Sequence, residues 1–323
     1  MPLVWASGAP DTASQGILKL QFKISIEDFM DLRRFVSVTT FPPLMLIALI
    51  APMHAAKNAS CTFETFSAPS GYSLSMVNGV SDDGTVVGQL VDNNAQQFVA
   101  FTRSPGGAYT EYTVPQSSST WLYGRSGTGL NAGFYQDNAN PEHIHGFVLQ
   151  NGQYTIVNYP KATNTWLFDV NQLGASVGSF SASASLIKGF ILVNGKYTTI
   201  AYPTAPATYP VALNDNGEVV GTWAGTSISN GMVWQNGTFT TVNYPKSKYG
   251  TALTGVNNSG VIVGNRLSGD KDFGFIYENG VFTNIVYSGA SYTMAGGINN
   301  NGLISGQIYL NGNNTLGYTA VCK

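Results

Sequence analysis

The chain has 323 residues, a formal net charge of −2 and only 10% charged residues, against roughly 25% in ordinary globular domains. Its 15 Lys and Arg residues are spread along the sequence and form no basic stripe of the kind that binds nucleic acid, so we expect no nucleic-acid partner. The polar residues are mainly Ser, Thr, Asn, Gln and Gly, a composition common in exported β proteins.

The N-terminal part of the sequence divides into two segments. Residues 1–29 match nothing downstream, which indicates an unstructured extension or a start codon placed too early. Residues 30–56 are typical of a secretory signal peptide, because Arg33 and Arg34 precede an apolar run over 44–51 that is too short to span a bilayer. The pattern predicts cleavage near Ala55, a secreted, extracellular or periplasmic location, and no membrane span after cleavage.

The remaining residues, 57–323, contain a unit that occurs six times, and its clearest copy covers residues 165–203. Two turn signals divide this copy, a polar stretch ending in Gly174 and the dipeptide Asn194-Gly195, which is preferred by type I′ hairpins. The runs between them are rich in Val, Ile, Phe, Tyr and Thr and show no helical period. We therefore predict four antiparallel strands per copy, at about 165–170, 175–180, 189–193 and 196–202.

Two columns of glycine align the copies. The first closes the turn between the first two strands, and its members are Gly84, Gly129, Gly174, Gly217, Gly260 and Gly302. The second falls four residues later in each copy, at Gly88, Gly133, Gly178, Gly221, Gly264 and Gly306. A four-stranded repeat with a period in the low forties is typical of a β-propeller, in which blades bury their faces against one another around an axis. The sequence thus predicts an all-β, six-bladed propeller.

The sixth copy lacks its fourth strand, and the missing piece lies at the other end of the repeat region. Residues 61–69 align with residues 195–203, so the N-terminal strand is expected to complete the last blade. In this alignment Cys322 falls on Asn194 and Cys61 falls on Gly195, which predicts a disulfide where the other blades have a covalent turn. The chain-entropy argument assigns such a bridge roughly 4–5 kcal/mol. Two unpaired buried thiols, or a lipid on Cys61, are the alternatives.

The repeat resembles that of the bacterial extracellular proteins called the HAF repeat family. The resemblance is carried by an Asn-x-x-Gly-x-Val-Val-Gly pattern followed by Gly-Phe, Asn-Gly and Tyr-Pro, and three segments show it best, at 214–221, 257–264 and 299–306. This chain has Gly-Phe where the family name implies His-Ala-Phe. The resemblance implies an exported, propeller-like bacterial protein and brings no catalytic residues with it.

One column near the start of the predicted first strand carries aromatic residues in three successive copies. Its members are Met76, Trp121, Trp166, Tyr209, Ala252 and Met294. If Trp121, Trp166 and Tyr209 face the mouth of the channel, they form an arc of flat faces suited to sugars or to a protein partner. The alternative is that they pack between blades. The Ser or Thr that precedes each of them is expected to cap a turn locally.

Few other residues suggest chemistry. Asp169 lies on a first strand where the other copies have Gly or Ala, and we include it among the candidate ligand contacts. His143 and His145 would point to one face of a strand, as two zinc ligands need, but no Cys, Asp or Glu pattern completes a metal site. No catalytic residue and no cofactor is therefore assigned.

From these patterns we expect a monomeric, secreted binding or cell-surface interaction module whose partner is an extracellular glycan or protein. The first alternative is an extracellular polysaccharide hydrolase or lyase that uses the channel mouth near Asp169 and the histidine pair. The second alternative is a structural component of the cell envelope.

Overall fold

The computed structural model describes residues 56–323 apart from 184, 226–227, 270–271 and 311–313. The predicted extension 1–29 and all of the predicted signal peptide except its last residue lie outside the described residues. The described part consists of β-strands joined by turns and contains no α-helix. The all-β fold predicted from the repeat is therefore confirmed.

The strands follow the copies of the repeat, with four strands to a sheet. The first sheet comprises β3 (Tyr72–Val80), β4 (Val86–Asp92), β5 (Phe98–Arg103) and β6 (Tyr109–Tyr112). The second comprises β7 (Ser117–Arg125), β8 (Asn131–Asp137), β9 (Ile144–Gln150) and β10 (Gln153–Val157). The third comprises β11 (Thr165–Val170), β12 (Ser176–Ser183), β13 (Leu186–Val193) and β14 (Lys196–Ile200).

The C-terminal half repeats this order. Next come β15 (Thr208–Leu213), β16 (Val219–Ala224), β17 (Ser229–Gln235) and β18 (Thr238–Thr241). They are followed by β19 (Gly250–Val256), β20 (Ile262–Leu267), β21 (Phe273–Glu278) and β22 (Val281–Ile285). The last group comprises β23 (Tyr292–Ile298), β24 (Leu303–Leu310), β25 (Asn314–Cys322) and the N-terminal β2 (Cys61–Phe66). Single parallel pairs, such as Ser229 with Gly250, join neighbouring groups.

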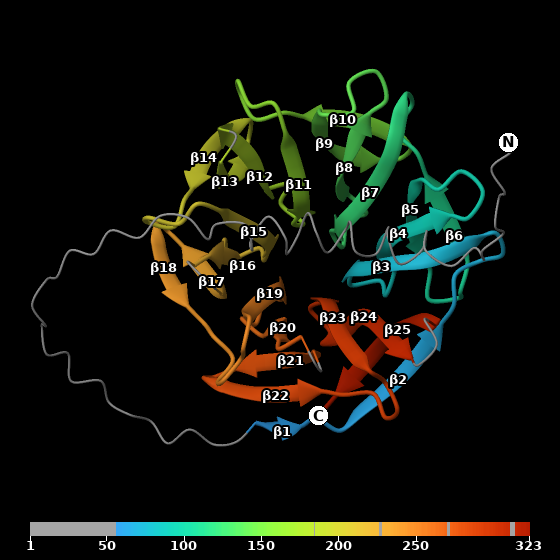
Figure 1. The fold of residues 1–323 in the computed structure, drawn as a ribbon, viewed down its shortest axis with the longest axis vertical. Helices are drawn as coiled ribbons and strands as arrows, with labels where there is room; N and C mark the ends of the chain where they lie inside the picture. Colours follow the sequence, from blue (N-terminus) through green and yellow to red (C-terminus); the bar gives the residue numbers. More distant parts are fainter. Residues whose placement is uncertain (1–55, 184, 226–227, 270–271, 311–313) are drawn as a thin grey trace, which may run out of the picture. The chain divides into compact units, whose positions relative to one another are not determined.

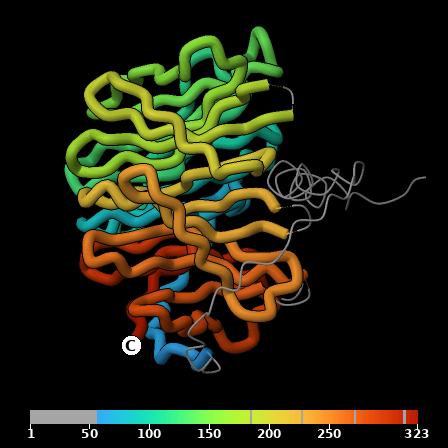
Figure 2. The backbone as a smooth tube through the Cα atoms, turned by 90° about the vertical axis from the view of Figure 1, so that its left-hand side faces the viewer, coloured from blue at the N-terminus to red at the C-terminus, as the bar shows by residue number. Residues whose placement is uncertain are grey.

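The sheets are arranged around a common centre (Figure 1). In each sheet the first strand named above lies innermost, and the other strands follow outward in the order given, so that the N-terminal β2 is outermost in the last sheet. Figure 2 shows the same sheets from the side as successive layers, with the N-terminal strands β1 (Lys57–Asn58) and β2 beside the C-terminal ones. This arrangement places the start of every first strand at the centre of the fold.

The predicted turns are present where glycine was expected. Each glycine of the first column has a positive φ between 75° and 85°, a conformation that other residues adopt only with strain. In the hairpins before β10, β14, β18 and β22, both Asn and Gly have positive φ, as type I′ turns require. The turn signals that divide the repeat therefore set the strand boundaries.

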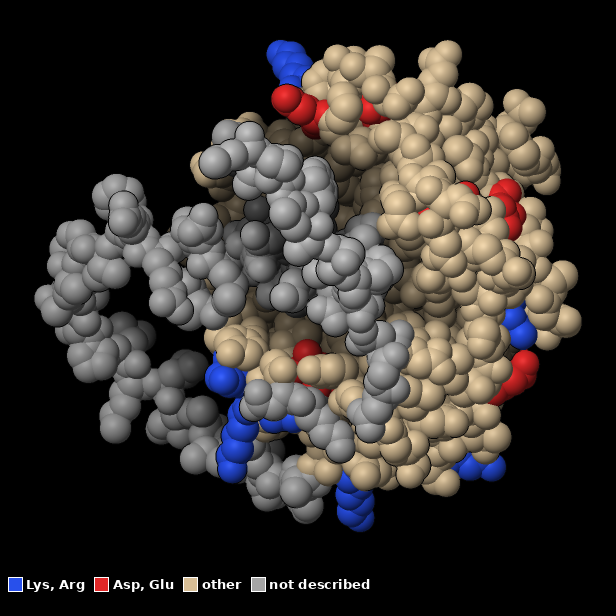
Figure 3. Space-filling model, turned by 45° about the vertical axis from the view of Figure 1, so that its right-hand side comes forward, with Lys and Arg blue, Asp and Glu red and all other residues tan. Residues whose placement is uncertain are grey.

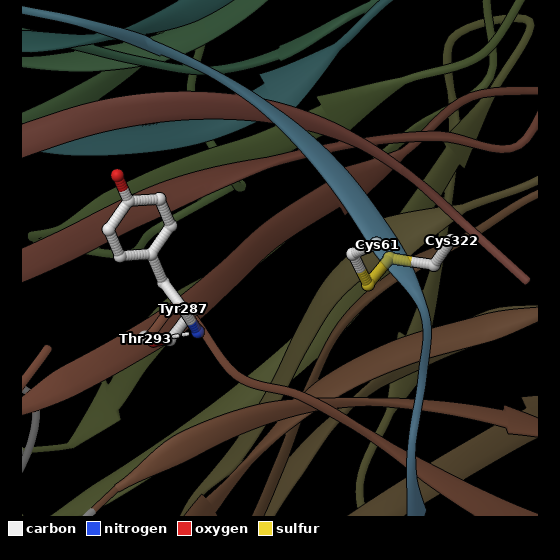
Figure 4. The surroundings of a disulfide bond; sticks show 4 residues. All are labelled: Cys61, Tyr287, Thr293 and Cys322. Carbon is white, nitrogen blue, oxygen red and sulfur yellow. Dashed lines mark hydrogen bonds between the residues drawn. A yellow bond between two sulfur atoms is a disulfide. The ribbon is translucent and has the colours of Figure 1, made fainter. Parts of the chain in front are cut away.

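The N-terminal strand completes the last sheet, as predicted. β2 pairs antiparallel with β25 from Cys61 opposite Cys322 to Phe66 opposite Gly317. The two cysteines form a disulfide with their Cα atoms 4.0 Å apart (Figure 4). The sequence did not predict β1, which runs parallel to β22 at Thr283 and Asn284 and covers its outer edge.

Apolar clusters fill the spaces between neighbouring sheets. Leu122 and Phe147 of the second sheet pack against Val87 and Ala100 of the first. The last and first sheets share a cluster of the same kind, in which Phe66 of β2 packs with Leu74, Val86 and Phe101. Because the last sheet packs on the first, the described unit has no exposed sheet face at the point of closure.

Candidate functional site

Two rows of partly exposed side chains line the innermost strands. The first row is the column singled out in the sequence, Met76, Trp121, Trp166, Tyr209, Ala252 and Met294. The second row lies two residues further along each strand, at Asn78, Tyr123, Phe168, Val211, Thr254 and Gly296. The residues between the rows, such as Leu122, Leu167 and Leu253, are fully buried between sheets. Because side chains alternate along a strand with a period of two residues, both rows face the centre of the fold. We call these two rows the inner face.

The second glycine column explains how the first row is held. A Cβ placed on Gly178 would lie 2.1 Å from the carbonyl oxygen of Trp166, and one on Gly221 would lie 2.0 Å from that of Tyr209. The first strands therefore press directly on the backbone of the second strands, an approach that only glycine permits. A β-bulge follows on each first strand, for example between Leu167 and Asp169. The bulge shifts the register beyond the second row.

Trp121 is packed against other rings on both sides. Its ring centroid lies 5.1 Å from that of Phe134, its partner across the strand pair, and 5.3 Å from that of Phe98 in the preceding sheet. Tyr123 and Phe168 extend this cluster, with centroids 5.2 Å apart. The sequence left open whether Trp121 packs between blades or faces the channel. In the structure it packs against a ring of the preceding sheet and keeps part of its surface exposed.

Trp166 differs from Trp121 in having no ring beside it. The residue across the strand pair is Ser179, which is too small to cover the indole. Among the described residues, no ring contact or hydrogen bond involves Trp166, and the side chain is partly exposed. Tyr209 occupies the same level of the next sheet, opposite Thr222. A partly exposed flat apolar side chain on an innermost strand is suited to stacking against a ligand.

Polar atoms lie beside these rings in the second row. Asn78 donates from its Nδ2 to Gln89 Oε1 at 2.6 Å and to the carbonyl oxygen of Leu122 at 2.7 Å, and its Oδ1 accepts no hydrogen bond from the described residues. The Tyr123 hydroxyl takes part in no hydrogen bond of the described residues, and burial raises the pKa of this phenol to about 12. Tyr123 therefore stays protonated at physiological pH and can donate or accept.

Asp169 lies on the bulge of β11. Its Oδ1 accepts the backbone N–H of Val170 at 2.8 Å, and its Oδ2 accepts that of Leu213 in the next sheet at 3.1 Å. The pKa of this carboxyl is raised to about 7, mainly because protein atoms displace water around it, although both backbone N–H groups act in the other direction. Gly124 of the preceding sheet makes room for the side chain, since a Cβ there would lie 2.1 Å from Oδ1.

The histidine pair lies in another part of its sheet. His145 is on β9, the third strand, where Nδ1 is 2.9 Å from Asn158 Oδ1 and Nε2 is 3.9 Å from Asp137 Oδ2. The His143 and His145 rings are perpendicular, with centroids 6.3 Å apart. Within the described residues, no group of three or more His, Cys, Asp or Glu side chains is placed to hold a metal ion. Neither histidine is brought together with Asp169.

The expected local role of the threonines is confirmed in five copies. Their hydroxyl oxygens accept the backbone N–H of a residue at the end of the preceding fourth strand, as Thr293 does from Tyr287 at 3.1 Å (Figure 4). The other four pairs are Thr120 with Val114, Thr165 with Tyr159, Thr208 with Tyr202 and Thr251 with Tyr244. These hydroxyls hold the link between sheets and are not available to a ligand.

The turns after the first strands form a hydrogen-bonded chain of polar residues. The Gln172, Asp215 and Asn258 backbone N–H groups each donate to the side chain of the corresponding residue in the next sheet. The chain continues from Asn300 to Asp82 and returns through Gln172 Nε2, which donates to Asp82 Oδ2 at 3.0 Å. No local pattern in the sequence indicates this closed chain, because its members come from different copies of the repeat.

Few charges approach the inner face. Neither of its rows contains a Lys, Arg, Asp or Glu, and Asp169 is the one acidic residue at the bulge position of the first strands. In Figure 3 the charged side chains are scattered and most of the visible surface is uncharged. A ligand on the inner face therefore meets aromatic rings, neutral polar groups and one carboxyl.

Comparisons with known proteins identify the fold. No protein-family profile matches the chain, and no curated protein sequence does. The β-propeller domain of the Trilobed protease from Pyrococcus furiosus is similar in structure, with a TM-score of 0.50, 6% identity, and coverage of 82% of this chain and 92% of that one.

Two further solved structures are similar to a comparable degree. A protein of unknown function from Dyadobacter fermentans has a TM-score of 0.52 and 12% identity, over 81% of this chain and 98% of that one. A mutant of AofleA from Arthrobotrys oligospora has a TM-score of 0.51 and 11% identity, over 81% and 88%. At these identities the likeness establishes a β-propeller fold. In the described residues, no helix is long and apolar enough to cross a membrane.

Proposed function

We propose that this chain is a secreted β-propeller that binds glycans on its inner face, with Trp166, Trp121 and Tyr209 as the main contacts. The proposal rests on Trp166, a large flat side chain on an innermost strand that is partly exposed and has no ring or hydrogen-bonding partner among the described residues. A ligand that stacks on the partly exposed indole would bury apolar surface that no ring of the described residues contacts.

The architecture that we infer is a six-bladed ring. Its support is the agreement between the copies in the sequence and the groups of strands, of which the last joins the two ends of the repeat region. Secretion is supported by the Cys61–Cys322 disulfide, since such bonds persist in oxidising compartments. The apolar segment after Arg34 would then be a signal peptide, and the repeat would belong with the HAF repeat family.

Binding is favoured over catalysis by the surroundings of Asp169. Hydrolysis of a glycosidic bond generally needs two carboxyl groups that flank the bond. Both oxygens of Asp169 already accept backbone N–H groups, and the histidine pair lies on a different strand of another sheet. We therefore assign the inner face to recognition.

The test is a binding measurement on the full chain with immobilised neutral and acidic oligosaccharides. Trp166→Ala is expected to weaken binding about 30-fold, the loss typical of an aromatic anchor at the centre of a binding site. Trp166→Phe keeps a flat ring and should retain most of the affinity. Val281→Ala, an exposed position on an outermost strand, is the matched control and should bind as the parent does.

Two results would contradict the proposal. Binding that survives replacement of Trp166, Trp121 and Tyr209 together, in a protein that remains folded, would move the ligand away from the inner face. Shortening of the oligosaccharides during the same measurement would favour the enzymatic alternative.

A further inference from the structure

The inner face is unequal around the ring. On the second and third sheets it carries Trp121, Tyr123, Trp166 and Phe168, all with large rings. On the fifth and sixth sheets the corresponding residues are mostly small, namely Ala252, Thr254 and Gly296. The two halves of the inner face therefore differ in the size and the chemistry of their side chains, and the large flat rings are all on one half.

Three polar groups are gathered on that aromatic half. Asn78 is bonded to the carbonyl of Leu122, which is the residue before Tyr123. Asp169 lies against Gly124, which is the residue after Tyr123. The Tyr123 ring is in edge contact with Phe168, whose neighbour along the strand is Asp169. Asn78, Tyr123 and Asp169 therefore lie on the innermost strands of the first three sheets, and Trp166 is on the same strand as Asp169.

None of these three groups carries a positive charge. A carboxylate accepts hydrogen bonds only, the free atom of Asn78 is an acceptor, and a phenol can do either. The remaining polar member of the second row, the Thr254 hydroxyl, already donates to the carbonyl oxygen of Ala295 at 3.1 Å. Neither row contains a Lys or Arg that could neutralise an anion. A bound hydroxyl group can donate to the acceptors and accept from the Tyr123 phenol or the Trp166 indole N–H, whereas a bound anion would meet no cation in either row.

We propose that the inner face selects neutral, hydroxyl-rich sugar units and rejects units that carry a carboxylate or a sulfate. The sugar ring stacks on Trp166, its hydroxyls donate to Asn78 Oδ1 and Tyr123 Oη, and Asp169 contributes the negative charge that disfavours an anion. This inference rests on the proposed function, because it names the ligand class of the same face. Desolvating an anion beside Asp169 without a compensating cation is the physical basis of the rejection.

The experiment compares cellohexaose, maltohexaose and mannohexaose with hexagalacturonate, on the full chain, at about pH 8, where Asp169 is ionised. Binding of at least one neutral probe is expected, with binding of the acidic probe at least tenfold weaker. Tyr123→Phe removes one hydroxyl and should weaken the neutral probe about three- to tenfold. Tyr154→Phe is the matched control, since its hydroxyl is on outermost strand β10, and it should change nothing.

Asp169→Asn tests the origin of the selectivity. Asparagine has nearly the same size as aspartate but no charge. The ratio of the affinity for the neutral probe to that for the acidic probe should therefore fall about tenfold, while the neutral probe still binds. The ratio of two affinities measured on one folded variant is independent of how much of the protein has folded, which keeps the test valid if the variant is less stable.

The outcomes separate the two proposals. If Trp166→Ala abolishes binding but Tyr123→Phe and Asp169→Asn leave both affinity and ratio unchanged, the selectivity proposal is wrong and the proposed function stands. If the acidic probe binds as tightly as the neutral ones, the selectivity proposal is again overturned. If none of the probes binds, or Trp166→Ala has no effect, the proposed function itself fails and the inference with it.

Discussion

The carboxylate of Asp169 on β11 accepts the backbone N–H of Leu213 on β15, so one side chain ties together the innermost strands of two neighbouring sheets. The same carboxyl has its pKa raised from an ordinary value of 3.8 to about 7, mainly by burial, with the charge of Asp215 adding a smaller contribution. In the folded protein, the carboxyl group that binds Leu213 therefore stays protonated to a higher pH than an ordinary aspartic acid does.

A pH dependence of stability follows from this carboxyl. Between pH 3.8 and about 7 the folded state holds a proton that the unfolded state has released. The free energy of unfolding should therefore fall as the pH rises through this window, by at most about 4 kcal/mol, and then level off above it. Below pH 3.8 both states are protonated, so Asp169 contributes no slope.

Asp169→Asn should flatten that part of the profile, because an amide does not titrate. Urea unfolding of the parent and the variant at a series of pH values measures the difference. If the two profiles run parallel from pH 4 to pH 7, the buried carboxyl is not the group responsible.

The disulfide should stabilise the fold by restricting the unfolded chain. The bridge closes a loop with a sequence separation of 261 residues, and the chain-entropy argument assigns about 5 kcal/mol to a loop of this length. Replacing Cys61 and Cys322 by Ala together should lower the free energy of unfolding by up to that amount. A reductant should lower the unfolding midpoint of the parent and leave that of the variant unchanged. If the reductant does not change the midpoint of the parent, the expectation is wrong.

A buried asparagine in the first turn of each later sheet links it to the next sheet. Asn257 Nδ2 donates to the carbonyl oxygen of Asn299 at 3.3 Å, while its Oδ1 accepts the N–H groups of Ser259 and Val261. Asn257→Ala loses all three bonds in a buried position and should cost roughly 2–4 kcal/mol. Asn257→Ser copies the residue found at Ser81 and should cost about 1 kcal/mol. Equal losses in the two variants would show that the turn contacts do not matter.

Gly296 lies where the last sheet approaches the first. A Cβ at this position would lie 2.2 Å from the carbonyl oxygen of Val77, and both backbones are fixed in strands. Gly296→Ala should therefore destabilise the protein by roughly 3 kcal/mol. Gly106→Ala is the control, because its nearest neighbour is 3.9 Å away and its φ is not positive, so it should be close to neutral. Both are read from thermal unfolding.

Much of the fold could be predicted from the sequence because its signals repeat. The strands, the positive φ at Gly174 and at Asn194-Gly195, and the pairing of Cys61 with Cys322 follow from aligned turn residues, each of which has a local physical cause. Because the same turn residues recur at the same positions in several copies, a chance occurrence of such a residue in one copy can be recognised and set aside.

The candidate site could be predicted only in part, because its character depends on contacts between copies. The sequence shows Trp121 and Trp166 as equivalent, yet Phe98 and Phe134 contact the first ring, whereas the second has Ser179 as its cross-strand partner. Nor does the sequence show that the bulge on β11 turns Asp169 toward Leu213, or that Gln172 reaches Asp82 past Gly127. The contacts of Asp169 with Leu213 and of Gln172 with Asp82 join residues 44 and 90 positions apart, and no local pattern specifies them.

The sulfur bridge stands in the last sheet where the second to fifth groups of strands have an Asn-Gly hairpin, and Ser60 and Lys323 exchange two backbone hydrogen bonds just beyond it. The ring therefore has no obligatory starting point. A circular permutant that joins the strand ends through Asn-Gly and is opened at the hairpin before β14, with cysteines in place of Asn194 and Gly195, should rebuild the same structure with its seam in a different blade.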